Sequence, residues 1–289
     1  MYQYAFEIAG LRLQVESHFA LPDLFELQPY QVLHSPELPP DAVYTVEPLQ
    51  EDWQISGKKI LHDRQRAVYL QGDEEHRYYF WSVHSDSNYV LVRQNPADPS
   101  RCRICLPVQD IPRLMPHFRL AAFLAIERLL LYHKSFILHA SVVCWQDQGI
   151  LFSAPSGTGK STQADLWNRL EGAQIVNGDR GILRYTPQGY RVYGSPYAGT
   201  SGVFTNITVP IRAIVVLSQA RENSLQRLSP LVAFRKLYSE STALTWDAGF
   251  IDQLSGLLLQ IVSEVPVYHL ACRPDTQAVA LLKQVLSEA

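Results

Sequence analysis

The sequence has few of the features that mark secreted and membrane proteins. Its 289 residues include only four cysteines, too few to build a disulfide scaffold for a chain of this size. No apolar run reaches the roughly 20 residues that a membrane-spanning helix needs. Residues 1–10 have neither the charged region nor the long apolar stretch of a signal peptide. We therefore expect a cytoplasmic protein that does not contact a membrane.

Charge is also sparse, and charge of one sign is not clustered. Charged residues make up 18% of the chain, and the formal net charge is −3. Because nucleic-acid binding needs clustered lysine and arginine against the phosphates, a nucleic-acid partner is not indicated. Apolar residues make up 47%. A chain of this length and composition can bury a large core without disulfides or metals, in one large domain or two smaller ones.

The first part of the chain predicts a β-rich N-terminal domain, residues 1–115, in which short alternating segments are separated by turn-like residues. This domain carries no chemical motif, and by elimination we expect it to serve in substrate recognition. Residues 117–133 are apolar on most faces and predict one buried core helix. The predicted strands are 4–8, 11–15, 67–70, 78–82 and 89–93, with loops at 36–41 and 95–100.

The second part, residues 116–289, has the alternation of strands and helices that is typical of an α/β domain. The expected fold class is therefore α/β (α+β), with the smaller β-rich domain preceding it. Strands are predicted at 136–145, 149–153, 174–177, 182–185, 190–193, 211–217, 224–228 and 267–272. Helices are predicted at 161–170, 230–239, 250–264 and 275–287.

The strongest chemical signal is the segment 154–161, Ala-Pro-Ser-Gly-Thr-Gly-Lys-Ser, which we call the Gly-Lys-Ser loop. It matches the phosphate-binding P-loop pattern, with Ala154 in place of the usual first glycine. Gly157 and Gly159 allow backbone conformations that aim several N–H groups at one anion. The predicted helix that follows points its positive end at the same place. A Gly-rich turn that only caps a helix is the alternative interpretation.

These residue types predict ATP and Mg²⁺ as the ligands. Lys160 can place its ammonium group on the β- and γ-phosphates, and the Ser161 hydroxyl can ligate Mg²⁺. The expected nucleotide-binding residues are Ser156, Gly157, Thr158, Gly159, Lys160, Ser161 and Thr162.

Two more residues belong near this loop. Asp179 follows the predicted strand 174–177, and an acid at a strand end beside a P-loop tends to face the metal. His139 lies inside the predicted strand 136–145, shortly before the loop. Taken alone, a strand histidine is usually a satisfied core residue, and an aspartate between glycines can simply cap a turn.

His139, the Gly-Lys-Ser loop and Asp179, in this order and at similar spacings, resemble the HPr kinase/phosphorylase family, whose members share a catalytic fold with phosphoenolpyruvate carboxykinases. The stretches 193–199, 209–217 and 268–275 fit the same relatives, so the resemblance covers about residues 130–285. It implies a P-loop kinase domain of that fold. The oligomeric state stays open, although relatives in this family often assemble into oligomers.

The resemblance implies an ATP- and Mg²⁺-dependent kinase that phosphorylates a hydroxyl, on a serine of a peptide or protein or on a small molecule. Lys160 would hold the phosphates, and Ser161 with Asp179 would position Mg²⁺. Asp179 would also take the proton of the acceptor hydroxyl or orient it. His139 would lie beside Asp179 and tune its charge.

One position departs from the family. The family has a pair of aspartates at the strand end, and Gly178 stands in place of the first, which puts a reverse phosphorylase reaction in doubt. This departure keeps open a nucleotide-binding regulatory or scaffold module without chemistry. A carboxykinase-like metabolic enzyme is a weaker alternative, because the His/Lys metal-ligand set of those enzymes is not evident.

Several other residues have an ordinary interpretation beside a functional one. Arg180, Arg212 and Arg273 are candidates for phosphate or substrate contacts, although structural or solvated arginines are more common. Cys102 and Cys105 have the spacing of half a zinc site, but no second pair stands at a suitable distance. We expect two ordinary thiols there.

Overall fold

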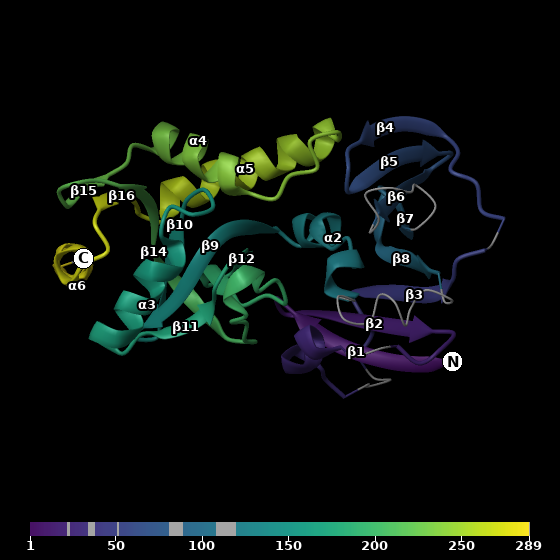
Figure 1. Cartoon of the computed structure of the whole chain (residues 1–289), viewed down its shortest axis with the longest axis horizontal. Coiled ribbons are helices and arrows are strands. Elements are labelled where there is room, and N and C mark those ends of the chain that lie inside the picture. The colour runs from purple at the N-terminus through teal and green to yellow at the C-terminus, as the bar shows by residue number, and fades with distance from the viewer. Residues whose placement is uncertain (22–23, 34–37, 51, 81–88, 108–119, 289) are drawn as a thin grey trace. The chain divides into compact units, whose positions relative to one another are not determined.

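Figure 1 shows a computed structural model of the chain, which describes residues 1–21, 24–33, 38–50, 52–80, 89–107 and 120–288. The fold is mixed α/β, with two large sheets and few helices. The chain divides into two compact units, Met1–Tyr132 and His133–Ala289, each built on an eight-stranded sheet. No helix in the described ranges is long and apolar enough to cross a membrane.

The first unit is a sheet in the order β1-β2-β3-β8-β7-β6-β5-β4. Its pairs are antiparallel except β2–β3 and β3–β8, which are parallel. The strands are β1 (Tyr2–Ile8), β2 (Leu11–Ser17), β3 (Ala42–Pro48), β4 (Lys58–His62), β5 (Arg66–Gln71), β6 (Glu74–Phe80), β7 (Tyr89–Asn95) and β8 (Asp98–Leu106), with a 3-10 helix, η1 (Phe25–Tyr30).

All five strands predicted in this unit are present, although positions 81–82 of the fourth lie outside the described residues. The sequence pattern missed β3, β4 and β8. The expected loop at 95–100 is wrong in part, because Asp98–Ser100 already belong to β8. Aspartate and proline disfavour a strand, yet Asp98 pairs with Asn95 of β7, and residues 102–105 of β8 are paired on both sides, with β3 and β7. For the expected loop at 36–41, residues 36 and 37 lie outside the described part.

The expected continuous helix at 117–133 is wrong. Its described part is a 3-10 helix, η4 (Leu120–Phe123), followed by the short helix α2 (Glu127–Tyr132). The two are separated by Ala125, whose φ of 45° is left-handed and breaks a right-handed helix. Most of the described run is nevertheless buried, as expected for its composition, although Tyr132 at its end is exposed. Residues 117–119 lie outside the described chain.

Helix α2 is fastened to the first sheet by buried ion pairs. Glu75 on β6 accepts from Arg77 Nε and from Arg128 Nη2, each at 2.6 Å, and Arg77 Nη1 donates to Glu127 at 2.9 Å. Paired in this way, the charges can be buried at tolerable cost. These contacts place α2 in the first unit, so the boundary between units falls at 132/133, whereas the sequence pattern placed the domain boundary at 115/116.

The second unit contains every strand and helix that the sequence predicts between residues 136 and 287, with ends that differ by a few residues. The strands are β9 (Ser135–Trp145), β10 (Gln148–Ser153), β11 (Gln174–Asn177), β12 (Arg180–Thr186), β13 (Gly189–Tyr193), β14 (Thr208–Gln219), β15 (Ser224–Arg227) and β16 (Val267–Cys272). The helices are α3 (Lys160–Glu171), α4 (Pro230–Glu240), α5 (Ala248–Glu264) and α6 (Thr276–Glu288), with a 3-10 turn, η5 (Gly199–Ser201).

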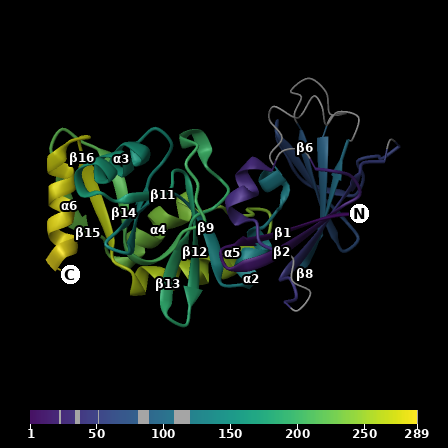
Figure 2. The ribbon, with the colours of Figure 1, turned by 90° about the horizontal axis from the view of Figure 1, so that it is seen from below.

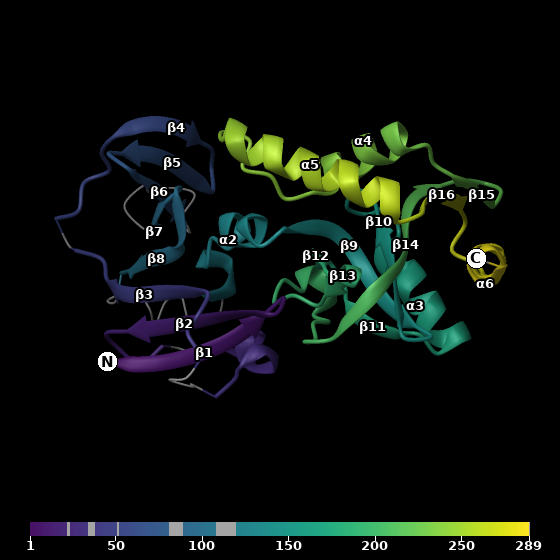
Figure 3. The ribbon, with the colours of Figure 1, turned by 180° about the vertical axis from the view of Figure 1, so that it is seen from behind.

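The second sheet has the order β10-β9-β12-β13-β14-β16-β15, with an additional β10–β14 pairing and with β11 paired to β9. Strands β10, β14 and β16 are parallel neighbours, so their carboxyl ends lie along the same edge. Figure 2 shows the β12–β13 hairpin that extends from this unit. Figure 3 shows α4 and α5 together on one side of the sheet and α3 on the other. The edge formed by the three parallel ends is where ligands bind in open α/β sheets.

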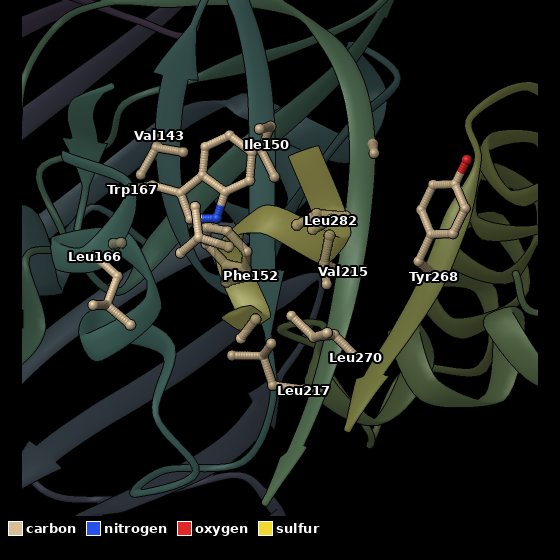
Figure 4. Close-up of a cluster of buried hydrophobic side chains, with 14 of the residues drawn as sticks. Val143, Ile150, Phe152, Leu166, Trp167, Val215, Leu217, Tyr268, Leu270 and Leu282 are labelled. Carbon is tan, nitrogen blue, oxygen red and sulfur yellow. The ribbon is translucent and has the colours of Figure 1, made fainter. Parts of the chain in front are cut away.

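A buried cluster beneath α3 fixes the helix to the sheet (Figure 4). Trp167 is fully buried and packs edge-on against Trp145, with ring centroids 5.3 Å apart, and against Phe152 at 6.3 Å. Leu282 from α6 and Val215 from β14 belong to the same cluster. Since the Gly-Lys-Ser loop connects β10 to α3, this core holds both ends of the loop in place.

We predict that Trp167→Ala lowers the free energy of unfolding by about 3–5 kcal/mol, because it leaves a large cavity under α3. Leu170→Ala, on the same helix but 45% exposed, is the matched control and should cost less than about 1 kcal/mol. Urea unfolding followed by circular dichroism measures both. Equal losses in the two variants would contradict the packing described here.

Candidate functional site

The Gly-Lys-Ser loop has the backbone conformation that its glycines predict. Gly157 and Gly159 have φ values of 79° and 121°, a region that residues with a side chain rarely adopt. A Cβ at either position would meet nothing within 4 Å, so there is room for a side chain. Glycine is therefore required at these positions by the backbone conformation and not by close packing. Ala154 has no positive φ, and alanine therefore serves in place of the usual first glycine without strain.

The polar side chains of the loop divide into one buried lysine and several exposed hydroxyls. Lys160 is 7% exposed, and its ammonium group donates to the carbonyl oxygens of Ala154 at 2.9 Å and Pro155 at 3.5 Å. Burial lowers the pKa of Lys160, while the nearby carboxylates of Asp179 and Glu240 act in the opposite direction. The hydroxyl-bearing residues Ser156, Ser161 and Thr162 are exposed.

His139 and Asp179 lie side by side, as the resemblance described above implies. The antiparallel β9–β12 pairing places His139 opposite Arg180, and Ala140 N donates to Asp179 O at 2.8 Å. His139 Nε2 lies 3.2 Å from Asp179 Oδ1. The hydrogen bond between His139 and Asp179 is the main cause of two pKa shifts. It raises the pKa of His139, and it lowers the pKa of Asp179. Both shifts favour an imidazolium–carboxylate pair.

A second carboxylate, Glu240, completes this cluster, and no sequence pattern predicted it. Glu240 Oε2 lies 3.0 Å from His139 Nδ1, although the two residues are 101 positions apart. The end of α4 is held there by the backbone, because Thr242 N donates to Ile137 O at 2.9 Å and Ser241 forms a bridge to Leu138. An imidazolium has a donor for each of its two carboxylate partners, whereas neutral histidine has only one.

Gly178, which directly precedes Asp179, is fixed by close packing. A Cβ at this position would lie 2.5 Å from Ser201 Cβ, closer than two carbon atoms can approach without a shift. Gly178 N donates to Val203 O at 3.1 Å, and Ser141 Oγ donates to Gly178 O at 2.8 Å. A Cβ on Gly199 would likewise lie 2.6 Å from Asp179 Cγ. The segment 198–203 therefore lies directly against the end of this strand and needs glycine on both sides.

The three candidate arginines have different surroundings. Arg180 Nε lies 3.4 Å from Asp179 Oδ2, so Arg180 adjoins the cluster. Arg212 donates to Gln148 and to the Leu286 carbonyl oxygen, which indicates a structural role. Arg273 is about half exposed and pairs with Asp275 at 3.0 Å.

The cysteine pair shows no sign of a metal site. Cys102 and Cys105 are buried on β8, and burial raises the pKa of each thiol to about 12, which disfavours the thiolate that binds zinc. Across the described residues, no group of three or more His, Cys, Asp or Glu side chains is arranged to hold a metal ion. Magnesium bound through phosphates needs only one or two protein oxygens, such as those of Ser161 and Asp179.

Comparison with known proteins adds a distant structural likeness. No protein-family model and no curated protein matches the sequence. Among solved structures, the chain is similar to the HPr(Ser) kinase/phosphatase from Coxiella burnetii, at 13% identity and a TM-score of 0.31, over 53% of this chain and 88% of that one. Such a weak likeness only hints at a relationship. What this chain does has to be inferred from its own residues.

We predict that Gly178→Ala lowers the free energy of unfolding by about 1–3 kcal/mol, because its Cβ overlaps Ser201. Ser201→Gly removes the overlapping atoms, so the double variant should recover part of this loss. Thermal unfolding of the two single variants and the double variant gives the coupling between the positions. A fully stable Gly178→Ala protein would show that the packing against Ser201 does not require glycine at position 178.

The cluster also predicts a pH dependence of stability. Because the pKa of His139 is raised above 6.5, its contribution is complete below pH 6.5 and is lost as the pH rises through the folded-state value. Because the pKa of Asp179 is lowered below 3.8, its contribution is complete above pH 3.8 and is lost as the pH falls through the folded-state value. Both contributions are therefore complete between pH 3.8 and 6.5.

His139→Gln, which keeps polar atoms but cannot be protonated, provides the comparison. The difference in unfolding free energy between the wild type and this variant should be largest in that window and should shrink above it. Urea titrations at a series of pH values measure the difference. A difference that stays constant up to pH 9 would mean that His139 is not held as an imidazolium.

Proposed function

We propose that this chain is an ATP- and Mg²⁺-dependent kinase, which transfers the γ-phosphate to a hydroxyl, most simply on a serine of a peptide or protein, or else on a small molecule. The observation that carries the proposal is a juxtaposition within the second unit. A loop with left-handed glycines and a buried lysine adjoins the cluster of His139, Asp179 and Glu240, and the charges of Asp179 and Glu240 act on the pKa of the Lys160 ammonium.

Phosphate binding would use the loop as it stands. The N–H groups at the start of α3 have no helical partners and point toward an incoming anion. Lys160 now donates to two neutral carbonyl oxygens of its own loop. Exchanging these for phosphate oxygens would give stronger, charge-assisted hydrogen bonds. Ser156 and Thr162, which are exposed, and Thr158, which is partly buried, would add contacts around the phosphates.

Ser161 and Asp179 would hold Mg²⁺ together with phosphate oxygens and water, and the ion would supply charge neutralisation at the γ-phosphate. These two residues fit Mg²⁺ by the chemistry of their ligand atoms. Ser161 is exposed at the first turn of α3, and Asp179 is a carboxylate with a lowered pKa, so both offer the hard oxygen ligands that Mg²⁺ prefers.

Asp179 would receive or orient the proton of the acceptor hydroxyl. In the transfer, a bond forms between the acceptor oxygen and the γ-phosphorus while the bond from that phosphorus to the β–γ bridging oxygen breaks. ADP leaves with the bridging oxygen, and the hydroxyl proton passes to Asp179. His139, hydrogen-bonded to Asp179 and Glu240, would fix the orientation of the Asp179 carboxylate. Such a reaction depends on positioning and charge neutralisation more than on covalent help.

Gly178 favours one second candidate, a nucleotide-binding regulatory or scaffold module without chemistry. The acid that the family has at this position is absent, and the packing against Ser201 leaves no room for it. Such a module would bind ATP tightly and would transfer no phosphate. The same absence argues against a reverse phosphorylase reaction.

The test is phosphate transfer from γ-labelled ATP with Mg²⁺ to a panel of serine peptides and hydroxyl metabolites. We expect Asp179→Asn to lower the transfer rate by about 10²–10⁴-fold, the usual contribution of acid–base catalysis. Lys160→Ala should abolish ATP binding. Asp165→Asn and Lys236→Ala, both at exposed helix positions, are the matched controls and should behave like the wild type.

Two results would count against a kinase. ATP binding that Lys160→Ala removes, without any labelled acceptor across the panel, would favour the regulatory module. Full transfer activity in Asp179→Asn would remove Asp179 from the reaction.

A further inference from the structure

A cavity of about 360 Å³ lies beside the Gly-Lys-Ser loop, within the second unit. One wall is formed by Gly157–Gly159 of the loop and by Thr162 and Gln163 of α3. The second wall is formed by Leu217 and Gln219 at the end of β14, by Ala220, and by residues 272–274 at and after the end of β16. This volume falls within the range of about 300–1,000 Å³ that is usual for small-molecule sites.

The cavity and the cluster of His139, Asp179 and Glu240 adjoin different parts of the Gly-Lys-Ser loop. Neither Lys160 nor Asp179 is among the described residues that line the cavity, whereas Thr162 is. In a P-loop the lysine reaches the β- and γ-phosphates, while the backbone cradles the α- and β-phosphates. A triphosphate with its γ-end at Lys160 and Asp179 would therefore turn its α-end, and the group attached to it, toward the cavity.

We propose that this cavity binds the nucleoside of the triphosphate, with the base between its two walls. This inference rests on the proposed function and names the part of the ligand that gives it specificity. The cavity lies at the common edge of three parallel strands, where α/β sheets bind their ligands.

The lining has the chemistry of a base-binding site. Leu217, Ala220 and Pro274 offer apolar surface for the faces of a flat ring. The side-chain amides of Gln163 and Gln219 each have donor and acceptor groups, which can form hydrogen bonds with the edge of the ring.

Both amides are held only loosely. Gln219 Nε2 makes long hydrogen bonds, at 3.4 and 3.5 Å, to the carbonyl oxygens of Gly157 and Thr158. Gln163 is buried, and its Nε2 donates only to the weak acceptor Cys272 Sγ at 3.4 Å. In the part of the chain that is described, Gln163 Oε1 has no hydrogen-bond partner. Either amide would therefore lose only weak hydrogen bonds when it reorients to bind a ligand.

The experiment compares ATP with inorganic tripolyphosphate, which has the phosphates but no nucleoside. Isothermal titration calorimetry on the full chain with Mg²⁺ should show ATP binding at least about 10-fold more tightly. Ala220→Phe fills the cavity and should weaken ATP binding by about 10-fold or more without changing tripolyphosphate binding. Ala280→Phe, in the groove between α3 and α6, is the matched control and should change neither.

The outcomes separate this inference from the proposed function. Equal affinities for ATP and tripolyphosphate in the wild type would overturn the nucleoside site while leaving the phosphate site in place. Unchanged ATP binding in a folded Ala220→Phe protein would also overturn the nucleoside site. If that variant does not fold, Gln219→Leu replaces it, with a selective loss of ATP affinity expected. Binding of neither ligand by the wild type would overturn the proposed function and this inference together.

Discussion

The pairing of β9 with its neighbours is the constraint on which the second unit depends. This eleven-residue strand pairs with β10 at one edge and with β12 and β11 at the other. Strand β10 leads directly into the Gly-Lys-Ser loop, and Asp179 lies between β11 and β12. His139 lies on β9 itself. The register of one strand therefore brings the loop, the histidine and the aspartate together, and a shift by one residue would turn His139 to the other face of the sheet.

Electrostatics then gives this geometry its chemical character. His139 lies between two carboxylates, and Lys160 and Arg180 add positive charge at the same place. Partial burial strengthens each of these interactions relative to water. With the imidazolium counted, three cations face two carboxylates, which suits a site that receives a highly charged anion. The same arrangement lowers the pKa of Asp179 and keeps it ionised, which its proposed role as proton acceptor requires.

The sequence predicted the second unit well because its signals are local. Glycines at positions 157 and 159 predict the positive φ values that the loop adopts. The strands and helices between residues 136 and 287 have clear apolar periodicity. The failures come from tertiary structure. Strand β8 starts with Asp-Pro and forms because neighbours pair with it on both sides, and the helix expected at 117–133 is interrupted by the left-handed Ala125. Glu240 has no motif, because a contact 101 residues away leaves no trace in local pattern.

The most direct measurement is a crystal structure of the full chain with Mg²⁺ and the β,γ-imido analogue of ATP. The account predicts that the triphosphate lies on the backbone N–H groups of the Gly-Lys-Ser loop. Lys160 Nζ should leave the carbonyl oxygens of Ala154 and Pro155 for the phosphates, with the terminal phosphate facing Asp179. A loop without the analogue at saturating concentration, or a terminal phosphate directed away from Asp179 and His139, would contradict the central claim.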